Sequence, residues 1–136
     1  MKNINLVSLR IITADIRTLV QFFEKVTGVE AKWSTDDFAE VVTSSFTLAI
    51  GSTRTLAFFG EEVAQPAANK SVIIEFLVEN VDVEYKRIKD LAIDIVQKPT
   101  TMPWGNRSLL FRDTDGNLIN FFTPVSSEAI KKFASR

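Results

Sequence analysis

The segment LVSLRIITADIRTLVQFFEKVTG, residues 6–28, carries the pattern that decides the fold. In its first seven residues apolar and polar side chains alternate and β-branched side chains are frequent, which predicts a strand. Asp15 then suits a helix N-cap, and Gly28 suits the position that follows a helix. Apolar residues lie between them at helical spacing: Ile16, Leu19, Val20, Phe23 and Val26. The segment therefore predicts a strand followed by a helix with one apolar face.

The same pattern returns in residues 72–91. A strand over 72–78 is followed by Asn80 as a helix cap, and the helix is expected to present Val81, Tyr85, Ile88 and Leu91 inward. In this alignment Arg10 stands opposite Glu75, and the later segment TLAFF (55–59) stands opposite LINFF (118–122). The chain thus contains an internal repeat.

The remaining segments complete each copy of the repeat. Further strands are predicted over 29–33, 38–42, 46–50, 55–59, 93–97, 108–112 and 118–122. Loops are predicted over 99–106 and at the tight turn 113–117, and Ser126 is expected to cap a last helix. We therefore predict one domain over 1–136, built from a module at about 1–62, a linker at about 63–70, a module at about 71–125 and a helix at about 126–134.

Composition excludes several classes of function. The chain of 136 residues is 46% hydrophobic, which argues against disorder, and its net charge of −1 gives no basic surface for nucleic acid. Neither Cys nor His occurs, so thiolate nucleophiles, Cys-ligated zinc and His-containing triads are excluded. No apolar run is long enough for a membrane span and no signal peptide is recognisable, so we expect a cytoplasmic protein.

Three short motifs resemble signatures of the vicinal oxygen chelate superfamily, which holds glyoxalase I, bleomycin-resistance proteins and extradiol dioxygenases. The segment WGNR (104–107) followed by DTDGNLI (113–119) resembles its W-G-x-R…D-P-D-G-N-x-I pattern. Asp15 with Phe22-Phe23 and Thr27-Gly28 resembles its D…FY…LG pattern, and VENVD (78–82) resembles V-D-D-V-D. The resemblance covers about residues 5–124.

The resemblance implies an α+β fold. Two βαβββ modules, related by a pseudo-two-fold axis, would each curl a mixed sheet around a cavity with the helices outside, and the chain would form a homodimer. Strand alternation agrees with one face turned to each helix. Val7, Leu9 and Ile11 would face the first helix, whereas Ser8 and Arg10 would point the other way. Glu75 would point away from the second helix.

The resemblance also implies metal ligands, usually His or Glu, on the first and last strands of each module. They fall here on Ser8, Ala57, Ile73 and Asn120. Alanine and isoleucine cannot bind a metal, and neutral Ser and Asn make a poor site for a divalent cation. We therefore expect no metal and no other cofactor, and this departure speaks against glyoxalase or dioxygenase activity.

The cavity then keeps four polar candidates, Ser8, Arg10, Glu75 and Asn120. Arg10 and Glu75 could form a structural ion pair, since buried charges are normally paired. Alternatively, Arg10 could bind a carboxylate or phosphate of a ligand with its planar fork.

Aromatic residues are the other candidates for a ligand site. Phe38, Phe59, Trp104 and Phe122 are expected to line a pocket, with Trp33 and Phe46 as further candidates, although plain core packing is the competing interpretation. Core positions are expected for Phe22 or Phe23, Phe58, Phe76 and Phe121. Arg107 is expected to tie its loop to Asp113 or Asp115, and the 113–117 turn is not expected to bind calcium.

Three functions remain open. The first is a metal-free module that binds or sequesters a small organic ligand, as the resemblance to bleomycin-resistance proteins implies. The second is a metal-dependent lyase, isomerase or dioxygenase with a non-standard carboxylate site, in which Glu75, together with Glu40 or a partner chain's carboxylate, would act as ligand or general base. The third is an interaction module whose cavity is filled by its own side chains.

Overall fold

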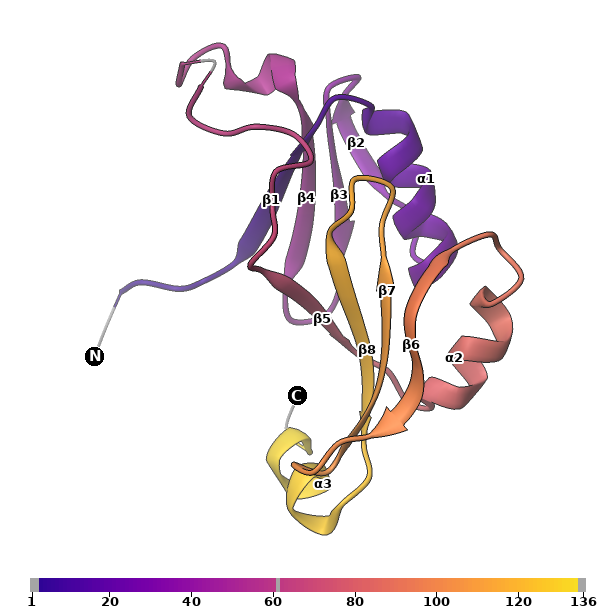
Figure 1. Ribbon diagram of the computed structural model, residues 1–136. Coiled ribbons are helices and arrows are strands. Elements are labelled where there is room, and N and C mark those ends of the chain that lie inside the picture. Colours follow the sequence, from indigo (N-terminus) through magenta and orange to yellow (C-terminus); the bar gives the residue numbers. More distant parts are fainter. Residues whose placement is uncertain (1–2, 61, 135–136) are drawn as a thin grey trace. The chain divides into compact units, whose positions relative to one another are not determined.

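The chain folds as two compact units, one that extends to Ala68 and one that begins at Asn69. The computed structural model describes residues 3–60 and 62–134. Each unit contains one four-stranded mixed sheet and a helix that covers one of its faces (Figure 1). This arrangement confirms the α+β fold of two βαβββ modules.

In unit 1 the elements follow the predicted order as far as residue 52. They are β1 (Ser8–Thr13), α1 (Ile16–Thr27), β2 (Lys32–Thr35), β3 (Phe38–Val42), β4 (Thr47–Ser52) and the short 3₁₀ helix η1 (Thr53–Leu56). The sheet order is β1-β4-β3-β2, with β1 parallel to β4 and the other two pairs antiparallel.

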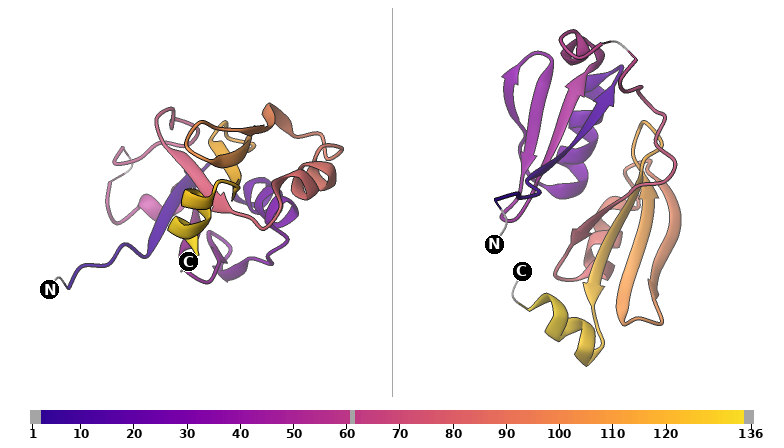
Figure 2. Two further views of the ribbon diagram at one scale, coloured as in Figure 1. Left: turned by 90° about the horizontal axis from the view of Figure 1, so that it is seen from below. Right: turned by 90° about the vertical axis from the view of Figure 1, so that its left-hand side faces the viewer.

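Helix α1 begins and ends where the sequence predicts. The Asp15 side chain accepts hydrogen bonds from the backbone N–H and the hydroxyl of Thr18, at 3.3 and 2.7 Å. Gly28 ends the helix with a positive φ of 72°, which favours glycine. The predicted apolar face is the buried one and packs on β3 and β4: Ile16, Leu19, Val20, Phe23 and Val26. Figure 2 shows α1 along one side of its sheet.

Unit 2 repeats this plan and adds a helix. Its elements are β5 (Ile73–Leu77), α2 (Val81–Ile88), β6 (Asp94–Thr101), β7 (Asn106–Arg112), β8 (Leu118–Pro124) and α3 (Ser127–Phe133). The order β5-β8-β7-β6 matches that of the first sheet. Its core contains aromatic rings packed edge to face, with Phe121 at 5.0 Å from Phe111 and 5.5 Å from Phe76 between ring centroids.

Three predictions of secondary structure are wrong. Residues 55–59 form no strand, because Ser52 accepts a hydrogen bond from the Arg54 N–H and starts η1, which is followed by a turn. Phe58 is consequently 98% exposed and not in the core. Strand β6 continues through Pro99 to Thr101, so the following loop is shorter than predicted. Helix α2 stops at Ile88 and leaves Leu91 exposed.

Helix α3 is fixed by a capping residue, by backbone hydrogen bonds just before it and by a ring contact with β8. Ser126 caps it by accepting a hydrogen bond from the Ala129 N–H at 3.1 Å. The Gly105 carbonyl accepts the Val125 and Ser126 N–H groups, and Gly105 has a φ of 94°. The ring of Phe133 packs on that of Phe122 at 5.1 Å. None of the helices in the described part of the chain is long and apolar enough to span a membrane.

Candidate functional site

The face of the first sheet that α1 leaves uncovered can be read from the strand register. Leu48 and Ile50 of β4 are buried in the core with α1, so Ala49 and Gly51, which alternate with them, lie on the opposite face. The ladder places Arg10 of β1 and Glu40 of β3 on either side of Ala49. Lys32 of β2 pairs with Glu40 on its other side, so this row of the open face carries Arg10, the methyl group of Ala49, the Glu40 carboxylate and a second cation.

Arg10 on this face contacts two aromatic rings. Its guanidinium carbon lies 5.6 Å from the ring centroid of Phe59 and 6.0 Å from that of Phe38, within the range of a cation–π interaction. Gly51 makes room for the arrangement: a Cβ there would lie 3.5 Å from the Arg10 Cδ and only 2.8 Å from the Thr55 hydroxyl. Three of the predicted site residues are thus brought together in unit 1.

Phe59 reaches this cluster from a turn and not from a strand. The N–H groups of Phe59 and Gly60 both bond to the Leu56 carbonyl, at 2.9 and 3.0 Å, and this fixes the turn after η1. Phe59 is 62% exposed, so most of its ring is open to a partner. Ser8 lies two residues before Arg10 on β1 and is also exposed.

The acidic residue next to Phe38 already has partners. Asp37 accepts hydrogen bonds from Arg54 Nε and the Ser52 hydroxyl, both at 2.8 Å, and forms an ion pair with Arg54 at 2.6 Å. The hydrogen bond from Arg54, and then that from Ser52, lowers the pKa of Asp37 below its ordinary value. Asp37 therefore stays ionised and is engaged by Arg54.

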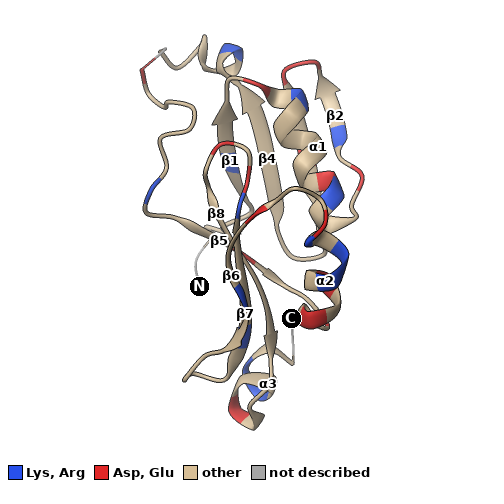
Figure 3. Cartoon of the chain, turned by 45° about the vertical axis from the view of Figure 1, so that its right-hand side comes forward, with Lys and Arg blue, Asp and Glu red and all other residues tan. Residues whose placement is uncertain are grey.

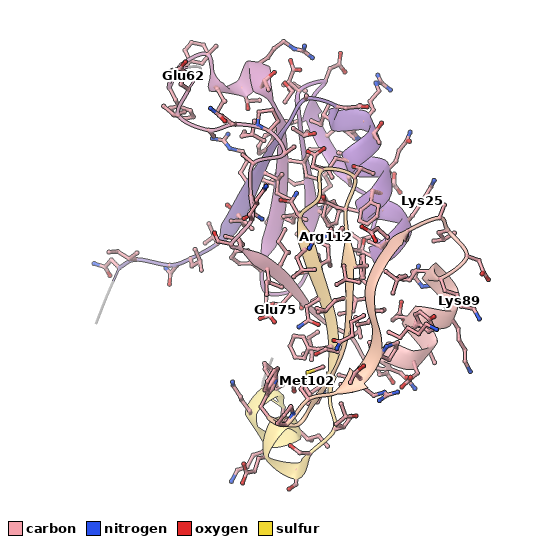
Figure 4. The ribbon with its side chains drawn as sticks, in the orientation of Figure 1. Lys25, Glu62, Glu75, Lys89, Met102 and Arg112 are labelled. Atoms are coloured by element: carbon pink, nitrogen blue, oxygen red, sulfur yellow. The ribbon has the colours of Figure 1, made fainter. Side chains whose placement is uncertain are left out.

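In unit 2 the corresponding open face carries a carboxylate and an amide. Glu75 and Asn120 are direct neighbours across β5 and β8, and the Asn120 Nδ2 donates to Glu75 Oε2 at 2.8 Å. Figure 4 shows the Glu75 side chain on the side of β5 away from α2. Asn120 is only 8% exposed, whereas Glu75 is exposed.

One atom of Asn120 has no partner. Its Oδ1 is buried and lacks a hydrogen bond among the described residues. The amide cannot be turned over to correct this, because Oδ1 would then face the Glu75 carboxylate and both groups would be acceptors. A buried acceptor without a donor costs about 1–3 kcal/mol, so its retention calls for an explanation.

The two aromatic candidates of unit 2 differ in exposure. Phe122 is buried beneath Phe133 of α3, at one end of the open face. Trp104 lies in the turn between β6 and β7 and is 67% exposed. A hollow of ≈ 440 Å³ lies near α3 and is lined mainly by apolar residues: Leu77, Val78, Glu79, Thr123, Pro124, Ile130, Phe133 and Ala134. Trp104 is not among these residues.

The structure corrects one of the four expected metal positions. Residue 57 lies outside the sheet, so Ala57 cannot occupy it. Arg10 pairs with Ala49 in the first sheet as Glu75 pairs with Asn120 in the second, which makes Ala49 the counterpart of Asn120. The corrected set is Ser8, Ala49, Ile73 and Asn120.

The corrected set fits a metal no better than the expected one. Two members have hydrocarbon side chains, and the two oxygen donors are neutral, so the set offers no anionic or imidazole ligand for a divalent cation. Across residues 3–60 and 62–134, moreover, no three His, Cys, Asp or Glu side chains are grouped so as to hold a metal ion. Figure 3 shows Lys and Arg interspersed with Asp and Glu along the ribbon.

Arg107 and the 113–117 turn have structural partners. Arg107 forms a bidentate pair with Asp82 of α2, at 2.9 and 3.1 Å, and not with Asp113 or Asp115. Asp113 is buried and accepts hydrogen bonds from the backbone N–H and the side-chain amide of Asn117 and from the Asp115 N–H. Burial raises the pKa of Asp113 above its ordinary value, and these hydrogen bonds oppose the shift.

Sequence reasoning missed Gly51 and Ala49, which shape the open face of unit 1. Both are small residues in an apolar run, and periodicity treats them as weak strand formers. A signal was present in the first strand, because an arginine at an open-face position needs space on the strand beside it. Finding that space requires the register between β1 and β4, which are far apart in sequence.

Comparison with known proteins agrees with this architecture. The family model of the Glyoxalase/Bleomycin resistance protein/Dioxygenase superfamily matches residues 5–121. No curated protein matches the chain.

Solved structures share the fold over most of the chain. A glyoxalase/bleomycin resistance protein/dioxygenase from Nocardioides is 17% identical, with a TM-score of 0.77 over 93% of this chain and 87% of the other. A family enzyme from Burkholderia phytofirmans PsJN is 14% identical, with a TM-score of 0.79 over 90% and 100%. An integron cassette protein from the mobile metagenome of V. cholerae is 28% identical, with a TM-score of 0.66 over 90% and 97%.

Proposed function

The chain belongs to the glyoxalase/bleomycin resistance protein/dioxygenase superfamily, and from this premise we propose that it binds or sequesters a small organic molecule on the open faces of its sheets without a metal ion. Membership alone does not choose between catalysis and binding, because one fold supports both. The choice therefore depends on the side chains at the site.

The donor chemistry supports binding over metal-dependent catalysis. Ser8, Ala49, Ile73 and Asn120 provide hydroxyl, methyl, branched hydrocarbon and amide groups. A lyase, isomerase or dioxygenase with a non-standard site would need carboxylates brought together, and Glu40 has no acidic neighbour in the ladder of its own sheet, where it pairs with Ala49 and Lys32.

The buried Asn120 Oδ1 is the observation that carries the proposal. Glu75 holds the amide so that its acceptor points away from the only side-chain partner of Asn120 in the described residues. A ligand N–H or O–H would satisfy this acceptor and remove its desolvation cost. The neighbouring Glu75 carboxylate, which is exposed, would accept a second hydrogen bond from the same ligand.

The homodimer and the cytoplasmic location stay predictions: the first follows from the family, the second from the sequence. A dimer would place two copies of the site in one particle.

Native mass spectrometry of untagged protein, purified without added metal or chelator, tests the proposal. We expect an organic adduct and no divalent metal. A stoichiometric metal would contradict the proposal and favour the enzyme. A bare protein mass would favour the interaction module with a filled cavity.

Replacing Asn120 separates a ligand contact from a structural role. Asn120→Leu removes the unsatisfied acceptor at similar volume, so we expect loss of the adduct while the free energy of unfolding stays unchanged or rises by about 1 kcal/mol. Denaturant unfolding and native mass spectrometry would measure the two effects.

Asn106→Leu is the matched control. The Asn106 Oδ1 is also buried without a partner among the described residues, on the same face of the second sheet but four residues further from the row of Asn120 along β7. This variant should keep the adduct. Adduct retained in Asn120→Leu, or lost equally in both variants, would argue against a ligand contact at Asn120.

A further inference from the structure

Arg10 is a cation on the open face of unit 1 whose charge has aromatic neighbours but no acidic partner among the described residues of that unit. Within residues 3–60 and 62–68 the Arg10 guanidinium makes no ion pair and no hydrogen bond; it contacts the rings of Phe38 and Phe59. We propose that Arg10, Phe38 and Phe59 form an anion-binding cluster, and that the ligand is a small organic anion with a flat apolar body. This inference rests on the proposed function and names its ligand class.

The nearby carboxylates explain why Arg10 is available. Asp37, beside Phe38, is bound by Arg54 and Ser52. Glu40 shares the open face, but two strand spacings separate its backbone from that of Arg10, about 10 Å. The Arg10 stem passes Gly51, and its guanidinium lies between the two phenylalanines.

The aromatic contacts leave the hydrogen-bonding capacity of Arg10 unused. A cation–π interaction draws on the charge of the guanidinium, whereas its five N–H donors lie in the plane of the group. A carboxylate or a phosphate fits two of these donors at once, which is why arginine is the usual residue for such groups. An anion would therefore add to the existing contacts without replacing them.

The two phenylalanine rings are the reason to expect a flat apolar body on the ligand. Phe59 is 62% exposed and Phe38 is half-buried, so each presents apolar surface next to the charge. A flat apolar body attached to the anion could stack on these rings and remove their surface from water. An inorganic ion would use only the guanidinium, so the cluster favours organic anions over small ions.

The experiment uses three fragments that share a ring and differ in charge: benzoate, phenyl phosphate and neutral benzamide. Each is titrated into isotope-labelled full-length protein while the NMR signals of the Arg10 Nε–H group and of the Phe38 and Phe59 rings are followed. We expect both anions to shift these signals in a saturable way, and benzamide to bind at least ~10-fold more weakly, as the loss of a charged hydrogen bond predicts.

Three variants locate the effect. Arg10→Met keeps the aliphatic stem and removes the guanidinium, and we expect its affinity for benzoate to fall at least ~10-fold. Arg10→Lys keeps the charge but not the bidentate geometry, so its affinity should lie between those of the parent protein and Arg10→Met. Arg17→Met is the control, because it removes an exposed arginine from α1, on the other face of the same sheet. It should bind benzoate as the parent protein does.

The opposing results are equally specific. Equal affinity for benzamide and benzoate, unchanged benzoate binding in Arg10→Met, or no shift at Arg10 with either anion would each overturn the anion-binding cluster. A neutral or cationic adduct in the native mass spectrum would do the same while leaving the proposed function intact. A stoichiometric metal would instead remove the proposed function.

Discussion

The open faces of the two sheets differ far more than the faces that pack on the helices. Both sheets have the same strand order, and both bury aliphatic and aromatic residues beneath a helix. On the open side, unit 1 has Arg10 next to Ala49, whereas unit 2 has Glu75 next to Asn120. The two units are thus alike on the side that folding requires, whereas the side chains of their open faces differ in charge and size.

The units also differ in the segment after the last strand. A substitution that tests this difference is expected to have the largest effect on the free energy of unfolding. Strand β4 leads into η1, whereas β8 leads into α3, which contacts Gly105. A Cβ at Gly105 would overlap the Ser126 side chain, and the φ of Gly105 is positive. Gly105→Ala should therefore lower the free energy of unfolding by about 3 kcal/mol.

Gly116→Ala is the control for this substitution. Gly116 also has a positive φ, but no heavy atom lies within 4 Å of a Cβ placed there. It should cost only about 1–2 kcal/mol, from backbone strain alone. Denaturant unfolding gives both values, and amide hydrogen exchange in β4 and β8 shows which unit is affected. Equal losses would mean that α3 moves aside freely.

The hairpins before the last strands provide the second test. In unit 2 the buried Asp113 accepts three hydrogen bonds within the turn, whereas in unit 1 the exposed Thr43 side chain bonds to the Phe46 carbonyl. Asp113→Ala leaves buried N–H groups unpaired and should destabilise the protein by about 2–3 kcal/mol. Thr43→Ala should cost less than about 1 kcal/mol. Thermal and denaturant unfolding would compare them, and similar losses would refute the difference.

The smallest expected effect on stability comes from one ion pair in each unit. Arg54 lowers the pKa of Asp37, and Arg107 lowers the pKa of Asp82, in both cases chiefly by a side-chain hydrogen bond. Because these pKa values are depressed in the folded state, each pair stabilises the protein above the ordinary pKa of aspartate and loses that contribution as the pH falls through the lowered value.

Arg54→Gln and Arg107→Gln should each raise the pKa of their own aspartate and leave that of the other unchanged. Carboxyl NMR titration would measure this. Asp113 serves as an internal reference, because its pKa is raised in the folded state and not lowered. Its effect on stability has the opposite sign: the free energy of unfolding falls as the pH rises from the pKa of Asp113 in the unfolded chain to its pKa in the folded protein. A change at Asp113 in either variant would show that the substitution disturbed more than one ion pair.

Local signals predicted the helices well. Asp15, Gly28, Asn80 and Ser126 cap helices where the sequence places them, because capping depends on neighbouring residues. The TLAFF segment misled for the same reason: its apolar run favours a strand, but the hydroxyls of Ser52 and Thr55 fold the backbone into η1.

The candidate site was predicted in part. Alternation correctly put Arg10 and Glu75 on the faces away from the helices. Phe59 was expected on a strand and reaches the Arg10 cluster from a turn instead. The assignment of Ala57 in place of Ala49 came from pairing the wrong segments, because the register of parallel strands depends on contacts between distant parts of the chain.

The two outer strands of each sheet differ in how readily a further strand could pair with them. Strands β2 and β6 are irregular edges with register shifts, and β6 also contains Pro99, features that discourage further strand pairing. Strands β1 and β5 pair regularly along their length and are the other edges of their own sheets. With Leu9 and Ile73 exposed on them, these regular edges are the places where each sheet could most readily accept a further strand.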